Sequence, residues 1–342
     1  MAHNPESALK VVFGAMTFGR PGKVQARITE LDDCSNTLDV LQKYGHNEID
    51  TARIYADGTS EEYLGQLHLQ DRGIITATKL SPLGRVPAMA AAFTIKMYTH
   101  EPGDLKPALQ DSLAALQAEK VNLLYLHGPD RGVPYEDTFR ELNNLYSQGY
   151  FRRLGISNYP AWEVAQICEI CIRNGWKKPD VYQGVYNSLQ RNIEAELLPC
   201  LRKYGISFYA YNPLAGGLLT DRYKRAGTDS EDSGGRFVAQ TWQSAGYRQR
   251  YWNDAHFDAL DKIRPLAQKL GIPTAEAALR WMNHHSALKR EHEDAIITCA
   301  SSAKQLEENL ISLTKGPLPE ELVQAFTDGW TTTKGVSAAY FF

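Results

Sequence analysis

Short apolar runs alternate with segments of helical periodicity along most of this chain. Runs of this kind, rich in β-branched and aromatic residues, predict strands. They lie at 11–15, 47–50, 74–79, 121–127, 153–157, 180–184, 206–211 and 295–300. The run at 11–15 is compatible with a barrel strand and equally with a hairpin that plugs a barrel.

Between these runs, apolar residues recur every three or four positions, which predicts helices with one buried face. Such faces are formed by Leu105, Leu109, Ser112, Leu113 and Leu116, by Phe139, Leu142 and Leu145, and by Leu306, Leu310 and Leu313. The stretch Thr59-Ser-Glu-Glu62 matches a capping box. It predicts that a helix starts just after Gly58.

Repeated alternation of strand and helix predicts an α/β protein with a parallel sheet and right-handed crossovers. About eight repeats favour a closed (β/α)8 TIM barrel over an open sheet. No low-complexity linker divides the 342 residues, so we expect one domain over 1–342. Residues 224–252 lack periodicity, and a loop of this length is typically functional or disordered. We expect it to be a lid-like insert at the active site.

The composition adds mainly exclusions. The formal net charge of -3 gives no reason to expect nucleic acid or an anionic membrane as a partner. No apolar run approaches the roughly 20 residues of a membrane-spanning helix. The first ten residues show no secretory signal, and the five cysteines are odd in number and dispersed. A cytoplasmic location is therefore expected.

The pair Cys168-x-x-Cys171 is the one local hint of metal or redox chemistry. It lies in a segment of helical character, and no second Cys or His pair at zinc spacing accompanies it. We interpret both residues as helix cysteines and predict no metal site.

Polar residues end nearly every predicted strand. They are Asp50, Lys79, His127, Ser157, Asn158, Gln183, Tyr211, Asn212, Ser301 and Ser302. In a (β/α)8 barrel, catalytic residues come from the carboxyl ends of the strands. A single polar strand end means little, but a ring of them on that face indicates an active site.

Four residues suggest a specific chemistry. A phenol has a pKa of about 10 and is a poor proton donor near neutral pH unless a cation stabilises the phenolate. Lys79 can provide that cation for Tyr55, and Asp50 can hold the ammonium in place. His127 can donate a hydrogen bond to a carbonyl oxygen. Together they form an acid that protonates an oxyanion as it develops.

A carbonyl that is protonated in this way also needs a hydride. Asn158 and Gln183 suit a nicotinamide carboxamide, and Tyr211 suits stacking on its ring. The segment 212–222 offers backbone N–H groups near paired glycines, and 301–309 opens a helix, both suited to phosphate. The chain has no G-x-G motif, so a Rossmann dinucleotide site is disfavoured.

These residues resemble the aldo-keto reductase superfamily, and most of all its aflatoxin aldehyde reductase and succinic semialdehyde reductase subfamily. The matching motifs, in family order, are VFGAMTFG, EIDTARIYADGTSEEYLG, ATKL, LLYLHGPD, LGISNY, VYQGVYN, FYAYNPLAGGLLT, YRQRYW and SSAKQLEEN. They extend from about residue 11 to residue 309, which is most of the chain.

The resemblance implies a (β/α)8 barrel that reduces an aldehyde or ketone with NADPH (NADP+), with Tyr55 as proton donor in a tetrad with Asp50, Lys79 and His127. The coenzyme contacts that it implies are Asp50, Ser157, Asn158, Gln183, Tyr211, Asn212, Pro213, Leu214, Gly216, Gly217, Leu219, Arg222, Arg236, Ser301, Ser302, Gln305 and Asn309. The substrate contacts are Met16, Tyr55, His127, Tyr247 and Arg250. It also leaves a homodimer open, since many relatives are dimers.

Two departures bear on specificity. The subfamily typically ends in an arginine that binds a substrate carboxylate, whereas this chain ends in Phe342. That difference favours less charged or aromatic carbonyl substrates. Gln305 stands where many aldo-keto reductases have an arginine near the adenosine phosphate. The contact to the 2′-phosphate would then rest on Arg222 or Arg236.

Other functions remain open beside this one. A non-catalytic regulatory barrel that binds NADPH shares the fold, and a reductase of a secondary-metabolite pathway differs only in substrate. A glycosidase needs two carboxylates across a cleft. The predicted strand ends offer one obvious acid, Asp50, which disfavours that reading.

Overall fold

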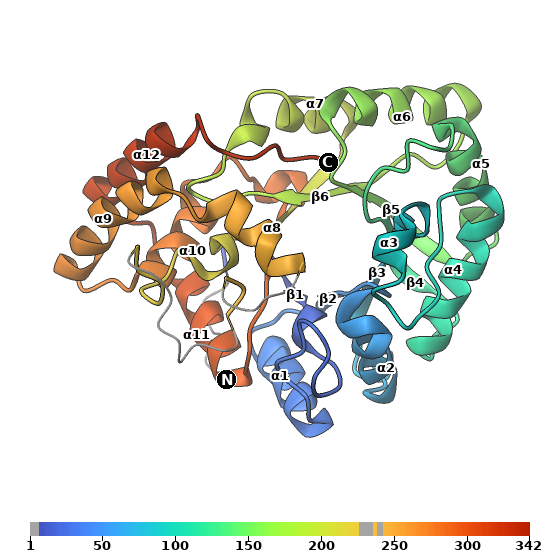
Figure 1. Ribbon diagram of the computed structural model, residues 1–342, viewed down its shortest axis with the longest axis horizontal. Coiled ribbons are helices and arrows are strands. Elements are labelled where there is room, and N and C mark those ends of the chain that lie inside the picture. Colours follow the sequence, from blue (N-terminus) through green and yellow to red (C-terminus); the bar gives the residue numbers. More distant parts are fainter. Residues whose placement is uncertain (1–6, 226–234, 238–241) are drawn as a thin grey trace.

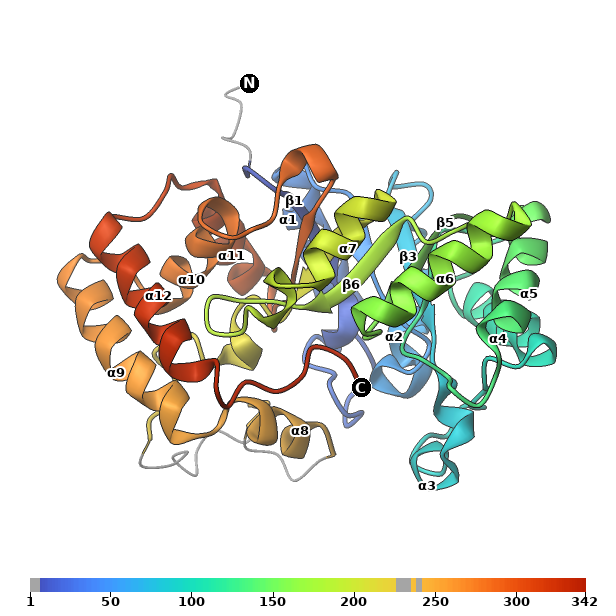
Figure 2. The same cartoon turned by 90° about the horizontal axis from the view of Figure 1, so that it is seen from above.

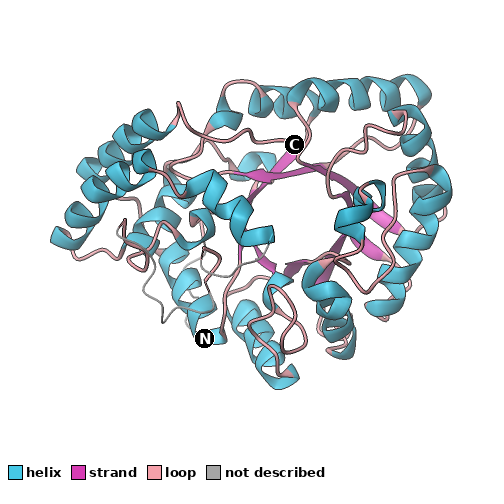
Figure 3. Cartoon of the chain, in the orientation of Figure 1, coloured by secondary structure: helices cyan, strands magenta, loops and turns pink. Residues whose placement is uncertain are grey.

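The computed structural model describes residues 7–225, 235–237 and 242–342. Its strands form one closed barrel with helices around it (Figure 1, Figure 3). The strands are β1 (Lys10–Gly14), β2 (Glu48–Asp50), β3 (Ile75–Leu80), β4 (Val121–Leu126), β5 (Phe151–Ser157), β6 (Val181–Val185), β7 (Ser207–Tyr211) and β8 (Ala295–Thr298). The (β/α)8 prediction is confirmed.

Every neighbouring pair of strands is parallel, in the order β1 to β8. The barrel closes between β8 and β1, where Lys10 pairs with Ala295 and Phe13 with Thr298. The run at 11–15 is therefore a barrel strand and not a hairpin plug. Because all strands share one direction, their carboxyl ends lie on the same face of the barrel.

The helices follow the strands along the chain. They are α1 (Leu31–Lys43), α2 (Thr59–Gln66), α3 (Pro87–Ala90), α4 (Pro102–Ala115), α5 (Tyr135–Ser147), α6 (Ala161–Asn174), α7 (Leu197–Tyr204), α8 (Trp242–Tyr251), α9 (Asp254–Lys269), α10 (Thr274–His284), α11 (Ala303–Thr314) and α12 (Glu320–Thr333). Figure 2 shows α3, α8 and the C-terminus together on one side of the barrel. The connections β3–α4 and β7–α9 supply α3 and α8 there.

The main core lies between the outside of the barrel and the helices, and the predicted helical faces are part of it. Leu109 and Leu142 are completely buried there. A smaller cluster fills the barrel itself, with Leu123, Tyr125 and Tyr209 among its members. Cys168 and Cys171 are buried, unpaired residues of α6, in agreement with their interpretation as helix cysteines.

Helix α2 starts at Thr59, directly after Gly58, as predicted. The capping box is wrong, however, because Gly58 is the residue at the N-cap and its backbone is left-handed, with φ at 88°. The Thr59 hydroxyl instead donates to the carbonyl of Ala56 at 2.7 Å. The side chain thus secures the preceding loop and does not cap the helix.

The insert predicted at 224–252 falls partly on residues 226–234 and 238–241, which lie outside the described residues. Its final part forms helix α8. Within the described part of the chain, no helix combines the length and the apolar character needed to cross a membrane.

Candidate active site

Three of the four predicted tetrad residues stand at the ends of adjacent strands. Asp50 is the last residue of β2, Lys79 is the last but one of β3, and His127 directly follows β4. Tyr55 begins the short 3-10 turn η2 (Tyr55–Gly58) after β2. Pairing of β2 with β3 and of β3 with β4 brings these ends together.

Lys79 is the centre of this group. Its Nζ lies 2.6 Å from Asp50 Oδ2 and 3.1 Å from the Tyr55 hydroxyl oxygen. It also donates to the carbonyl oxygen of Thr51 at 2.8 Å. The ammonium is completely buried, and the Asp50 side chain is only 5% exposed. One buried cation therefore contacts both the acid and the phenol.

His127 stands beside the phenol. Its ring centroid lies 5.8 Å from that of Tyr55, and the two rings are nearly perpendicular at 79°. Burial, helped by Lys79, lowers the pKa of His127 well below its usual value, so the imidazole is neutral at physiological pH. Its Nδ1 atom is buried and has no hydrogen-bond partner among the described residues. A neutral imidazole of this kind can donate a hydrogen bond to a ligand oxygen.

The pKa shifts of Tyr55 and Lys79 differ in part from what the sequence led us to expect. Burial, followed by the charge of Asp50, raises the pKa of Tyr55 well above its usual value. Burial lowers the pKa of Lys79, against the opposing effect of Asp50. Desolvation thus outweighs the expected downward shift at Tyr55 by Lys79. The raised pKa means that the Tyr55 phenol is protonated near neutral pH.

The ends of β5, β6 and β7 provide a second row of contacts. Gln183 donates to Asp50 Oδ1 at 2.8 Å, a contact that the sequence did not predict. The Asn158 amide donates to the His127 carbonyl oxygen and to the Ser157 hydroxyl, both at 2.9 Å. The Tyr211 hydroxyl donates to Asn158 Oδ1 at 2.8 Å. The predicted nicotinamide contacts therefore also hold the tetrad in place.

Both asparagines at these strand ends have left-handed backbones, with φ at 67° for Asn158 and 59° for Asn212. Asparagine tolerates this conformation better than most residues. After Asn212, the turn η5 (Ala215–Gly217) folds on itself, and the amides of Gly217 and Leu219 donate to the carbonyl oxygen of Leu214. This compact turn is the segment predicted to contact phosphate.

Arg236 is a candidate anion ligand. Its guanidinium donates to the Tyr247 hydroxyl at 3.1 Å, and the Cys299 side chain lies in hydrogen-bonding contact with it. No carboxylate of a described residue forms an ion pair with it. Burial, followed by the charges of Arg236 and Arg222, lowers the pKa of Arg27, so the guanidinium groups of Arg236 and Arg222 both lie near that of Arg27. Such a cluster favours an anionic ligand.

The start of α11 is capped by its own side chains. The Ser302 hydroxyl accepts a hydrogen bond from the backbone N–H of Gln305 at 3.2 Å. The side-chain oxygen of Gln305, Oε1, accepts from the backbone N–H and the hydroxyl of Ser301. Asn309 donates to the Thr298 hydroxyl at 3.3 Å and so ties the helix to β8. The predicted coenzyme contacts in this segment remain a prediction.

The predicted substrate contacts come from four segments: Met16 follows β1, Tyr55 lies in η2, His127 follows β4, and Tyr247 and Arg250 belong to α8. Met16 Sδ accepts from Gln243 of α8 at 3.7 Å, and the Tyr247 hydroxyl donates to Asn212 at 3.0 Å. Arg250 instead donates to the carbonyl oxygen of Ala339 at 3.2 Å, so α8 holds the C-terminal tail.

That tail ends at the same rim. The Phe342 amide donates to the Asn158 carbonyl oxygen at 3.3 Å. A Cβ atom on Gly128 would lie 3.5 Å from the Phe342 ring, so this ring packs beside the residue that follows His127. Phe342 is 63% exposed, so it presents an apolar surface near this strand end.

The sequence did not single out Cys299, Thr51 or Asp57. Cys299 directly follows β8. Successive side chains of a strand point to opposite faces, so the sequence indicates only that Cys299 and Thr298 point in opposite directions. The Thr51 contact uses a carbonyl oxygen, which every residue has, and no residue pattern could have predicted it.

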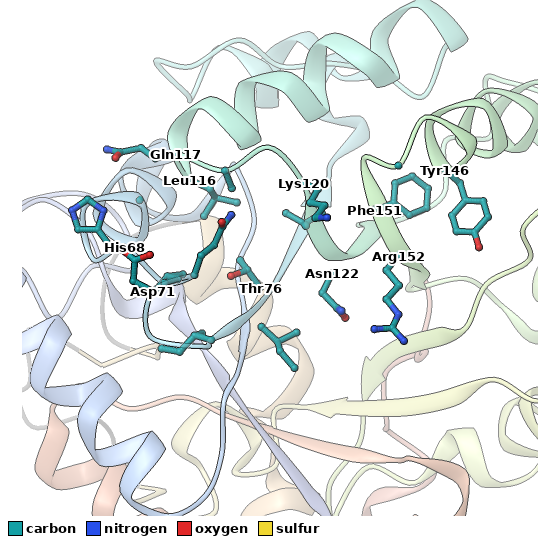
Figure 4. Close-up of a pocket in the computed structure, with 18 residues that line it drawn as sticks. His68, Asp71, Thr76, Leu116, Gln117, Lys120, Asn122, Tyr146, Phe151 and Arg152 are labelled. Atoms are coloured by element: carbon teal, nitrogen blue, oxygen red, sulfur yellow. The ribbon is translucent and has the colours of Figure 1, made fainter.

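A cavity of about 740 Å³ lies elsewhere, at the amino ends of β3, β4 and β5 (Figure 4). His68, Thr76 and Asn122 line it, together with Lys120 and Arg152. Thr76 is near the start of β3, whereas Lys79 is near its end, so this cavity belongs to the opposite side of the barrel. Catalytic sites of such barrels lie at the carboxyl ends of the strands.

A closed parallel barrel with a buried acid–lysine–phenol group and a neutral histidine at that rim defines a class: an oxidoreductase that reduces carbonyl groups with a nicotinamide coenzyme. The aldo/keto reductase family model matches residues 10–329. The chain belongs to this family.

Several aldo-keto reductases and aldehyde reductases are similar over almost their full length. Aldo-keto reductase pigE of Monascus ruber is 46% identical, over 99% of this chain and 98% of its own. Aflatoxin B1 aldehyde reductase member 2 of Homo sapiens is 40% identical, over 100% of this chain and 92% of its own. An aldo-keto reductase of Pseudocercospora fijiensis is 55% identical, over 89% of this chain and 99% of its own. The resemblance seen in the sequence motifs is confirmed.

Proposed function

We propose that this chain reduces an apolar or aromatic aldehyde or ketone with NADPH, and that Tyr55 donates the proton. The observation that carries the proposal is the position of Lys79, within hydrogen-bonding distance of both Asp50 and Tyr55. When bound, the coenzyme supplies the hydride that the carbonyl carbon receives. The residues of the chain supply the proton and orient the carbonyl group.

Tyr55 holds its proton until negative charge develops on the substrate oxygen, because its pKa is raised by burial. Lys79 then stabilises the resulting phenolate, and Asp50 holds the ammonium at 2.6 Å. Neutral His127 donates a hydrogen bond to the same oxygen and orients the carbonyl. This division of roles needs no change in the charge of the histidine.

The residues of the rim fit NADPH. Arg236 is a partly buried cation without a carboxylate partner among the described residues, as a pyrophosphate or phosphate ligand requires. Arg222 and Arg236 both repel the charge of Arg27 and lower its pKa, so Arg27 lies close to two other cations. An extra phosphate would relieve that repulsion, which supports NADPH over NADH.

The substrate preference rests on Phe342. In the place where the subfamily typically has an arginine, this chain presents an apolar ring beside Gly128, the residue after His127. A carboxylate beside this ring would gain no cation from it, whereas an aromatic group would bury apolar surface against it. We therefore expect aryl and alkyl aldehydes to be better substrates than aldehydes that carry a carboxylate.

The test is a fluorescence titration with NADPH and NADH, followed by turnover of acidic, aliphatic and aromatic aldehydes. We expect NADPH to bind more tightly, and benzaldehyde-type substrates to exceed succinic semialdehyde in kcat/KM. Tyr55→Phe should bind NADPH as the wild type does and lose about 10²-fold or more in kcat. Tight NADPH binding without turnover of any carbonyl would contradict the proposal and indicate a regulatory barrel.

A further inference from the structure

We propose that Asp57 is a positioning residue, which joins three loops of the barrel rim and thereby holds Tyr55 against Lys79. This inference rests on the proposed role of Tyr55 as proton donor. Asp57 does not contact the tetrad itself. It acts through the turn η2, which begins at Tyr55 and contains Asp57.

The Asp57 carboxylate binds groups from two other connections of the barrel. Its Oδ2 forms an ion pair with Lys23 Nζ at 2.7 Å, and Lys23 lies between β1 and α1. Thr94, between β3 and α4, donates its amide to Oδ1 at 2.8 Å and its hydroxyl to Oδ2 at 2.6 Å. The Asp57 side chain is 14% exposed, whereas Thr94 is exposed, so the shielding from water lies on the carboxylate side of these contacts.

The turn that carries Tyr55 needs such support. Ala56 and Asp57 are consecutive residues with left-handed backbones, with φ at 48° and 53°. Residues with a Cβ atom rarely adopt this conformation, which persists only where the surroundings hold it. The Thr59 hydroxyl contact to the Ala56 carbonyl oxygen holds one side of the turn. Asp57 holds the other.

The consequence for catalysis follows from how the two partners are held. Lys79 belongs to strand β3, whereas the backbone of Tyr55 belongs to the turn η2. The 3.1 Å distance between Lys79 Nζ and the phenol oxygen therefore depends on the turn. A displacement of about 1 Å in a reacting group can cost about 10²-fold in rate.

The charge state of Asp57 favours this role over the whole neutral range. Burial alone would raise its pKa, but the hydrogen bonds from Lys23 and Thr94 outweigh burial and hold the pKa below its usual value. The carboxylate is therefore ionised whenever the enzyme is near neutral pH. Among the charged groups of the described residues, Lys23 is the one that pairs with it.

Asp104 provides a matched control. It accepts from the amide and hydroxyl of Thr99 at 2.9 and 2.7 Å, the same pair of bonds that Thr94 makes to Asp57. Asp104 lies in the first turn of α4 and anchors the same β3–α4 connection, but it does not contact the turn of Tyr55. If the loss of activity comes only from a weakened loop, replacing Asp57 and replacing Asp104 should have similar effects. If it comes from displacement of Tyr55, only the replacement of Asp57 should lower the activity.

The experiment compares Asp57→Asn, Thr94→Val and Asp104→Asn in the full chain. For Asp57→Asn we expect kcat to fall about tenfold or more, NADPH affinity to stay within about twofold, and the isotope effect of 4-deuterated NADPH to rise because hydride and proton transfer become rate-limiting. Thr94→Val, which keeps the amide donor, should show a smaller loss of about threefold. Asp104→Asn should change none of these quantities.

Hydrogen exchange of the peptide that covers 51–59 gives a readout without turnover. It should become faster in Asp57→Asn and stay unchanged in Asp104→Asn. Unchanged kcat in a folded Asp57→Asn, or equal losses in both aspartate variants, would overturn the proposal. If Asp57→Asn does not fold, Thr94→Val decides alone, and wild-type kcat in that variant would overturn it. A wild type without turnover, but with the expected exchange, would refute the proposed function and leave the positioning by Asp57 intact.

Discussion

Lys79→Met separates what the buried ion pair does for stability from what it does for catalysis. Methionine fills a similar volume but removes the ammonium that contacts Asp50, Tyr55 and the Thr51 carbonyl oxygen. The variant leaves Asp50 as a buried carboxylate without its cation. Both folding and proton transfer should suffer, for different reasons.

The expected size of each effect follows from the geometry. Removing one partner of a buried ion pair typically costs about 3–5 kcal/mol, because the remaining charge is uncompensated. Asp50 keeps the hydrogen bond from Gln183, so we expect a loss near the lower end, about 3 kcal/mol. The kcat should fall about 10²-fold or more, since the phenolate loses its cation.

The assay combines urea unfolding with steady-state reduction of an aromatic aldehyde. Lys79→Met/Asp50→Asn removes the stranded charge, so it should recover most of the lost stability but none of the activity. Lys10→Met is the matched control, because Lys10 pairs with Glu48 at the other end of the barrel. That control should lose stability and keep its kcat.

Two results would refute this reasoning. An unchanged unfolding midpoint in Lys79→Met would mean that the pair is not a buried ion pair in solution. A double variant that regains activity together with stability would mean that Lys79 acts through folding alone and not on the phenol.

Three further predictions follow from other parts of the structure. Glu61 is buried, and burial raises its pKa to about 7. The folded state therefore binds the Glu61 proton more tightly than the unfolded state does. The contribution of Glu61 to the free energy of unfolding falls by about 3 kcal/mol as the pH rises from about 4.5 to 7. Urea unfolding at pH 5 and 7.5 should show this loss in the wild type relative to Glu61→Gln, and parallel pH profiles of the two proteins would contradict it. Phe342→Arg should raise kcat/KM for succinic semialdehyde about tenfold, because one charge-assisted hydrogen bond contributes about 1.5 kcal/mol or more. If the ratio of kcat/KM for acidic aldehydes to that for aromatic aldehydes stays unchanged, the tail does not reach the substrate. Gly216→Ala should weaken NADPH binding and destabilise the protein by more than about 1 kcal/mol. The reason is that φ is 71° at this position and the new Cβ would meet the Tyr247 ring at 2.5 Å. A melting temperature and an NADPH affinity equal to those of the wild type would argue against this prediction.

The barrel could be predicted from the sequence because each strand and helix carries its own local pattern. The run VNLLYL predicts β4 on its own, and the apolar spacing of Leu105, Leu109 and Leu113 predicts α4 on its own. Closure then follows from the number of repeats and the handedness of crossovers. The boundaries differ by one to a few residues because the strand ends depend on pairing across the barrel.

The candidate site was predictable in its residue types and less so in its contacts. Asp50, Tyr55 and Lys79 could be named because each lies near a strand end and belongs to a family motif. That Gln183 orients Asp50 could not, since 133 residues separate them. The direction of the Tyr55 pKa was also missed, because desolvation depends on the whole surrounding volume.

The amino-acid sequence by itself determined the order of the strands and helices, and with it which side chains stand at the strand ends, since periodicity and strand length are local properties. Tertiary structure alone decided that Lys79 reaches both Asp50 and Tyr55, that the left-handed turn at Ala56 and Asp57 is held by Lys23 and Thr94, and that Phe342 returns to the rim. Each of these contacts joins segments that are distant in the chain. Their distances are fixed only when the barrel closes and buries them.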